Sequence, residues 1–163
     1  LLTHHNNEES IGLILNQPTK INLNEILNNI PLSDFPVYIG GPVEKQSLHF
    51  IHTLGDLIPN AKKITDQIYF GGDFEKVIRL MHDKHITKSQ IRFFVGYSGW
   101  NREQLNNEIR EDSWIVDNAR ENMCRVILHQ NFGVILSSIV LQSRQVFLAN
   151  LCAIIKVKAA EIK

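Results

Sequence analysis

The stretch FFVGYSGW, residues 93–100, decides how this chain is interpreted. It joins an apolar run typical of a buried strand to a serine held among glycines. A serine on a sharp turn after a strand is the arrangement of a hydrolase nucleophile, G-x-S-x-G. The first question is therefore whether Ser98 is a nucleophile or part of a structural turn.

The spacing around Ser98 argues against catalysis. The order is Gly96, Tyr97, Ser98, Gly99, so the second glycine comes one residue too early for the motif. Only one histidine, His129, follows the serine along the chain. We therefore predict that the protein is not an enzyme and has no catalytic residue.

The residues after the serine favour a structural explanation. Asn101 is a preferred helix cap, and Gln104 is placed to bond back to the cap amide in a capping box. Trp100 before the cap and Leu105 after it have the spacing of a hydrophobic staple. The sequence therefore predicts a strand over 91–97 and a helix that begins at Asn101.

The rest of the chain alternates short strands with short helices. Further strands are predicted over residues 11–18, 47–53 and 113–116, and at the Gly-Gly exits within 37–44 and 68–75. Helices are predicted after Asn22, where a capping box with Glu25 begins a helix ended near Pro31, after Asp73 and after Asn118. Residues 57–63 are predicted as a loop, and the apolar run beyond Asn131 fits a strand or a helix. This alternation predicts a mixed α and β domain.

Composition excludes several classes of protein. The chain has 163 residues, about one domain, with 17 basic and 17 acidic side chains, which argues against direct nucleic-acid binding. Its two cysteines, Cys124 and Cys152, form no CxxC pair, so we expect a reducing, cytoplasmic location. The longest apolar region, residues 132–155, is interrupted by polar side chains, so we expect no membrane span.

The histidines do not predict a metal site. His49 and His52 lie three apart on a predicted strand and point to opposite faces, while His82 and His85 have no nearby acidic or sulfur partner. We expect no metal and no cofactor. A Gly-Gly turn can bind an anion through its backbone amides. At the turn of residues 71 and 72, however, the carboxylate of Asp73 would compete with an anion for the same amides.

Four separated pieces, IGLILNQP, VYIGGPV with HFIHT, FFVGYSGW with QLNNEI, and the strand of Trp114, resemble in order and spacing the AlgH/YqgE family of small bacterial proteins. The resemblance implies an α+β fold: one compact AlgH-like domain with a mixed, largely antiparallel sheet packed with helices. It also implies a cytosolic protein with no established catalytic activity or cofactor. In the family the position of Ser98 often holds alanine.

The resemblance also implies a regulatory role, because members of the family are labelled as transcriptional regulators. The chain has no helix-turn-helix signature, so we expect an indirect effect through an unknown protein partner or small ligand. The competing class is a small-molecule, nucleotide or enzymatic site where Asn16, Gly40, Gly41 and Tyr97 converge. The resemblance assigns one domain to residues 1–163, lacking the family's opening strand and divergent from about residue 123. The family positions carried over, most of them architectural, are Asn16, Pro18, Gly40, Gly41, Pro42, Phe50, His52, Gly96, Tyr97, Trp100, Leu105 and Trp114.

Overall fold

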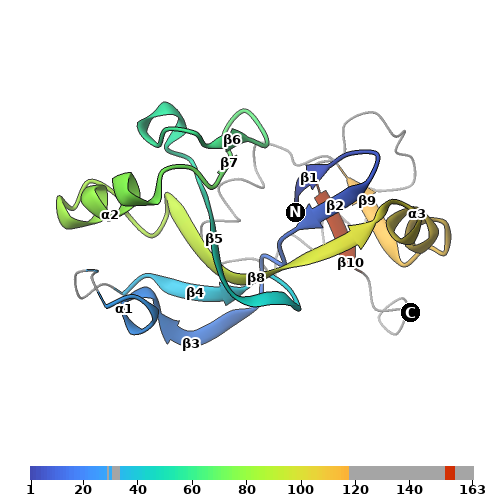
Figure 1. Cartoon of the computed structure of the whole chain (residues 1–163), viewed down its shortest axis with the longest axis horizontal. Helices are drawn as coiled ribbons and strands as arrows, with labels where there is room; N and C mark the ends of the chain where they lie inside the picture. The colour runs from blue at the N-terminus through green and yellow to red at the C-terminus, as the bar shows by residue number, and fades with distance from the viewer. Residues whose placement is uncertain (29, 31–33, 118–152, 157–163) are drawn as a thin grey trace.

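The computed structural model describes residues 1–28, 30, 34–117 and 153–156, and one curled sheet of eight strands forms most of that part (Figure 1). In chain order the elements are β1 (Leu2–His5), β2 (Glu9–Gly12), β3 (Pro18–Asn22), α1 (Leu23–Ile26), β4 (Pro36–Ile39), β5 (Val43–His52), a 3-10 turn η1 (Gly55–Leu57), β6 (Lys62–Lys63), β7 (Tyr69–Phe70), α2 (Phe74–His82), β8 (Ile91–Asn101), α3 (Arg102–Arg110), β9 (Trp114–Asp117) and β10 (Ala153–Lys156). The predicted α+β fold with a largely antiparallel sheet is confirmed.

β8 is the central strand of the sheet. It pairs antiparallel with β5 over most of its length, in parallel with β4 at residues 93–95, and antiparallel with β2 at its C-terminal end. β1 continues the sheet beyond β2, β3 beyond β4, and β7 and then β6 beyond β5. β9 and β10 form a separate antiparallel pair. Figure 1 shows β1, β2 and α3 around one end of β8, and α1, β3 and α2 toward the other.

Three neighbouring strands of the sheet bury consecutive residues on opposite faces. Successive side chains of a strand point to opposite sides, so a sheet covered on both faces has nearly continuous apolar runs. Each strand supplies one residue to each face: Val37 and Tyr38 from β4, Phe50 and Ile51 from β5, and Phe93 and Phe94 from β8. We call the two sides the Phe93 face and the Phe94 face.

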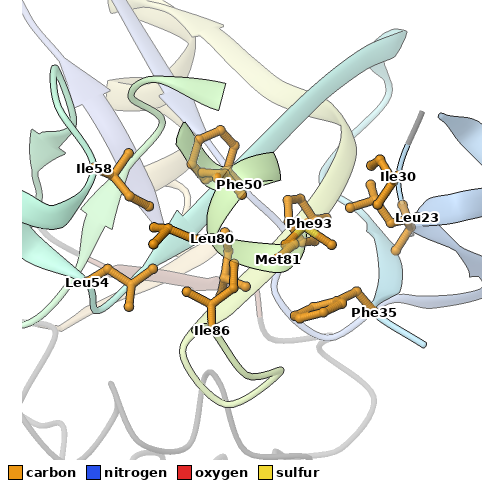
Figure 2. Close-up of a cluster of buried hydrophobic side chains, with 13 residues drawn as sticks. Leu23, Ile30, Phe35, Phe50, Leu54, Ile58, Leu80, Met81, Ile86 and Phe93 are labelled. Carbon is orange, nitrogen blue, oxygen red and sulfur yellow. The ribbon is translucent and has the colours of Figure 1, made fainter. Parts of the chain in front are cut away.

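The Phe93 face is covered mainly by α2. Asp73 caps this helix as predicted, because its Oδ1 accepts a hydrogen bond from the Lys76 amide at 3.0 Å. The helix then buries Val77, Leu80 and Met81 against the sheet. Figure 2 shows Phe50 and Phe93 of the sheet gathered with Leu80 and Met81 of α2 and with side chains from the surrounding connections.

The Phe94 face is covered by chain segments instead of a helix. Leu13 and Leu15, in the connection between β2 and β3, pack there with Ile68. Backbone hydrogen bonds hold this connection in place, including one from the Ile14 amide to the Gly40 carbonyl at 2.8 Å. This face is therefore closed by irregular backbone that carries polar groups with it.

Some predicted boundaries were wrong. Residues 11–18 do not form one strand, because β2 ends at Gly12 and the chain then crosses the Phe94 face before β3. The capping-box bond at Asn22 is present, its amide donating to Glu25 Oε1 at 2.8 Å, but α1 ends at Ile26, because the backbone of Leu27 is extended. Residues 57–63, predicted as a loop, include the end of η1 and the short strand β6. The helix predicted after Asn118 lies outside the described residues, as do His129 and both cysteines.

Candidate functional site

Three glycines form a tight corner where β4, β5 and β8 meet, and we call Gly40, Gly41 and Gly96 the glycine corner. The Gly40 amide donates to the Val95 carbonyl at 2.9 Å. A Cβ atom at Gly40 would overlap the Gly96 carbonyl oxygen, and one at Gly41 would overlap the backbone of Tyr97. The two glycines are therefore needed for close approach of backbone to backbone, which is the scaffolding role that the sequence favoured.

Gly96 changes which face of the sheet the following residue joins. Its φ is +69°, a left-handed conformation that favours glycine. Regular alternation would place Phe94 and Tyr97 on opposite faces, because they are an odd number of residues apart. Instead both pack on the Phe94 face, opposite an irregular register in β5 between Val43 and Leu48. The corner thus brings Tyr97 beside groups that the sequence pattern would have kept apart.

Ser98 lies within β8 and not on a turn after it. β8 continues to Asn101, four residues beyond the predicted end at Tyr97, and Ser98 pairs with Gly12 of β2. Its hydroxyl is buried and donates to the Gly40 carbonyl at 3.4 Å. The hydroxyl thus tethers β8 to the glycine corner, in agreement with the structural interpretation of this serine.

The predicted binding residues come together only in part. Gly40, Gly41 and Tyr97 meet at the glycine corner. Asn16 lies in the connection between β2 and β3, whose neighbouring residue Gln17 accepts a hydrogen bond from the Ile39 amide at 2.8 Å. The side chain of Asn16 is exposed and forms no hydrogen bond within the described part of the chain.

Tyr97 belongs to a polar and aromatic cluster that the sequence analysis missed. Its hydroxyl donates to Glu44 Oε1 at 3.4 Å, and its ring meets the His49 ring edge-on at 5.6 Å. His49 also stacks on Phe70 at 6.0 Å and hydrogen-bonds through Nε2 to the Ser47 hydroxyl at 2.8 Å. Partial burial lowers the pKa of His49 although the Glu44 carboxylate opposes this shift. This cluster offers a neutral imidazole, a phenol and a carboxylate on one patch.

His52 has a structural role on the Phe93 face. Its Nδ1 accepts from the Leu54 amide at 3.2 Å, which leaves the Nε2 proton to donate to the Gly71 carbonyl at 3.1 Å. The ring stacks on Tyr69 at 5.7 Å and is fully buried. Burial lowers the pKa of His52, with the bond to Gly71 acting in the opposite direction. Both ring nitrogens are therefore committed to backbone groups in the neutral form.

The region after Ser98 is held by a carboxylate between two indoles. Glu108 of α3 accepts hydrogen bonds from Trp100 Nε1 at 3.1 Å and from Trp114 Nε1 at 2.6 Å. The predicted cap at Asn101 is confirmed, its Oδ1 accepting from the Gln104 amide at 2.8 Å. The predicted return bond of a capping box was wrong, because the Gln104 side chain donates to Glu108 Oε1 at 3.0 Å. We call Glu108, Trp100 and Trp114 the tryptophan clamp.

Comparison with known proteins identifies the family. A family model described as AlgH-like matches residues 1–138. The chain belongs to the AlgH-like family. A UPF0301 protein of Chlorobaculum parvum is 40% identical over 119 residues, which are 73% of this chain and 64% of that protein. A UPF0301 protein of Parabacteroides distasonis is 42% identical over 118 residues, 71% of this chain and 60% of that protein. The AlgH-like chain thus spans somewhat less than two thirds of these relatives.

Solved structures share the fold of this AlgH-like chain. The solution structure of the AlgH protein from Pseudomonas aeruginosa superposes with a TM-score of 0.67 at 21% identity, covering 91% of this chain and 84% of that one. The crystal structure of protein DIP2367 from Corynebacterium diphtheriae gives a TM-score of 0.57 at 21% identity, covering 74% and 65%. At this level of identity the likeness concerns the fold alone.

The described part of the AlgH-like chain has neither a cluster of metal ligands nor a membrane-spanning helix. Within residues 1–28, 30, 34–117 and 153–156, no three side chains of His, Cys, Asp or Glu lie close enough together to ligate a metal ion. Nor does any helix in that part have the length and apolar character needed to cross a bilayer.

One buried charge of this AlgH-like chain escaped the sequence analysis. Arg92 stands inside the apolar run of β8, and it is buried. A lone charge between buried apolar residues was the signal that could have revealed it, since Arg is almost never fully buried without a partner. The motifs drew attention to the glycines and the serine instead.

Proposed function

We propose that this AlgH-like chain is a non-enzymatic protein that acts through a protein partner and affects transcription only indirectly. The observation that carries the proposal is the exposure of three isoleucines on the adjoining elements β3, α1 and β4. Ile21 of β3, Ile26 of α1 and Ile39 of β4 are 43%, 38% and 40% exposed. We call these three residues the isoleucine patch.

The isoleucine patch lies on elements that adjoin one another. β3 pairs with β4, and α1 follows β3 directly, as Figure 1 shows. Apolar side chains exposed on adjoining elements give another protein groups to contact along this edge of the sheet. The packed glycine corner supports the non-enzymatic part of the proposal, because its backbone is used for strand contacts.

Site-specific crosslinking tests the proposed partner surface. A photo-reactive phenylalanine analogue would replace Ile21 in the full-length protein in its own cells, and Glu75, exposed on α2, would be the control position. We expect one protein to crosslink at position 21 and not at 75, and the purified partner to bind Ile39→Lys at least tenfold more weakly than wild type. Equal crosslinking at both positions, or unchanged affinity of Ile39→Lys, would contradict the proposal.

The indirect effect on transcription is tested separately. The balance of 17 basic and 17 acidic residues supports it, because a DNA-binding surface needs clustered positive charge. We expect no specific mobility shift with promoter DNA. A specific shift whose affinity falls steeply with salt would show direct DNA binding instead.

A small-molecule site is the second candidate function, favoured by the cluster around Tyr97. The rings of His49, Phe70 and Tyr97 are partly exposed, and polar atoms lie beside them. Such a mixture of aromatic walls and a few polar groups is typical of ligand sites. A thermal-shift screen of metabolites would test this function: a stabilising compound that no longer stabilises Tyr97→Phe or Asn16→Ala would favour it over the partner proposal.

A further inference from the structure

Arg92 is the one charged side chain among the buried residues of the described part of the chain. It is 6% exposed and lies in β8 opposite Ile51 of β5. Its guanidinium sits over the Tyr38 ring, with Cζ 4.4 Å from the ring centroid. The positive charge is thus embedded among the buried side chains of the Phe94 face.

The partners of Arg92 leave most of its hydrogen-bonding capacity unused. Nη1 donates to the Leu15 carbonyl at 2.9 Å. Within the residues that the structure describes, Arg92 forms no ion pair with an aspartate or glutamate. The guanidinium has several further N–H groups in a planar fork that matches an oxyanion. One carbonyl and one aromatic ring do not satisfy that fork.

A buried cation without an anion is unfavourable. Removing an ion from water carries a large cost even after the protein relaxes, and buried charges are ordinarily paired. The contact with the Tyr38 ring offsets part of this cost, because the face of an aromatic ring attracts a cation. The carbonyl of Leu15 contributes one charge-assisted hydrogen bond. An anion would neutralise the charge of the guanidinium and would accept hydrogen bonds from its remaining N–H groups.

We propose that the guanidinium of Arg92 binds a small oxyanion, either a phosphate group or a carboxylate, beside the connection between β2 and β3. The Leu15 carbonyl fixes one side of the fork, and the Tyr38 ring fixes its plane, so the remaining N–H groups are preorganised for a bidentate contact. Asn16 and Gln17 follow Leu15 and are exposed, so the connection reaches solvent directly after the carbonyl that Arg92 contacts. This site is independent of the proposed protein partner.

Anion titrations of the full-length protein at constant ionic strength would test the site. Melting temperature would be followed in sodium phosphate and in sodium acetate, with sodium chloride as the reference salt. We expect a saturable rise with one of the two oxyanions, which identifies the source of the anion. Arg92→Lys keeps the charge but lacks the fork, so we expect at least a tenfold weaker apparent affinity. Arg79→Lys, the same change at an exposed position of α2, should bind as wild type does.

A measurement on the wild-type protein covers the case in which Arg92→Lys does not fold. The side-chain Nε–H resonance of Arg92 would be followed by nuclear magnetic resonance during the same titrations, with that of Arg79 as reference. We expect a saturable shift at Arg92 and a negligible one at Arg79. Equal shifts at both arginines, or no shift at Arg92 up to about 50 mM of either anion, would overturn the proposal.

Discussion

The two faces of the sheet differ in what they bury. The Phe93 face is apolar and is covered mainly by α2, and the imidazole of His52, which is buried there, has backbone partners for both nitrogens. The Phe94 face buries Arg92 and borders the cluster of Tyr97 and His49, under a connection that is not helical. One sheet therefore carries an apolar face covered by a helix and a face that also buries a positive charge.

The contrast shows where an activity of this fold should be sought. A helix satisfies its own backbone and covers apolar residues without introducing polar groups. A crossing connection brings carbonyls and amides to the surface of the sheet, as the bond from Arg92 to Leu15 shows. The segments that cover the Phe94 face, more than its strands, therefore give it more polar groups than the Phe93 face has.

The largest expected effect comes from the two aromatic residues that define the faces. Phe93→Ala should lower the free energy of unfolding by about 3 to 5 kcal/mol. Phe94→Ala should cost about 0.5 to 1.5 kcal/mol less, the value of one aromatic pair, because Phe93 has ring contacts with Phe35 and Phe50 whereas Phe94 has one with Tyr38. Urea denaturation of both variants measures the difference. A costlier Phe94→Ala would reverse the assignment of the stabilising face.

The glycine corner offers a smaller effect with a close control. Gly41→Ala should lower the free energy of unfolding by about 1 to 3 kcal/mol, because its methyl group would overlap the Tyr97 backbone. Gly99→Ala, whose Cβ would come no closer than 3.3 Å to the Tyr97 ring, should cost less than about 1 kcal/mol. Thermal melts compare the two. Equal costs would mean that the corner is not the close contact described here.

The tryptophan clamp lies outside both faces, so a substitution there gives a stability change with which those on the faces can be compared. Glu108→Ala would leave the indole N–H groups of Trp100 and Trp114 without this acceptor, at an expected cost of about 1 to 3 kcal/mol. Tryptophan fluorescence should change at the same time. Glu103→Ala, at an exposed position of the same helix, should be neutral, and a neutral Glu108→Ala would rule out the clamp as a source of stability.

The smallest expected effect is the pH dependence of the free energy of unfolding, to which a histidine on each face contributes. The folded state holds the pKa of His52 and of His49 below the ordinary value of about 6.5, so the unfolded state binds protons first as pH falls. Stability should therefore fall as pH drops below about 6.5. His52→Gln should flatten this dependence more than His49→Gln, because His52 is the more deeply buried. Urea melts from about pH 7.5 to about pH 5 measure it, and the opposite order would assign the pH response to the Phe94 face.

Local patterns in the sequence predicted much of the fold. Short-range preferences set the caps at Asp73 and Asn101, and their hydrogen bonds are present. The boundaries failed where long-range pairing prevailed. β8 extends through Ser98 to Asn101 because β2 supplies partners there, and α1 stops early because the chain after it is extended.

The candidate site was less accessible to sequence reasoning. Gly40, Gly41 and Tyr97 were chosen from motifs and do meet, yet the groups around Tyr97 come from β5 and β7. Their meeting depends on the irregular register of β5 and on the positive φ of Gly96, neither of which periodicity can show.

The sequence by itself determined the alternation of strands and helices, their caps and the family, because these depend on neighbours within a few residues or on motif order. Only the tertiary structure decided which face each residue joins and that Arg92 is buried with no carboxylate partner among the described residues. Burial and pairing depend on residues that are distant along the chain. Leu15 and Arg92, for example, come into contact only when the chain between them has folded.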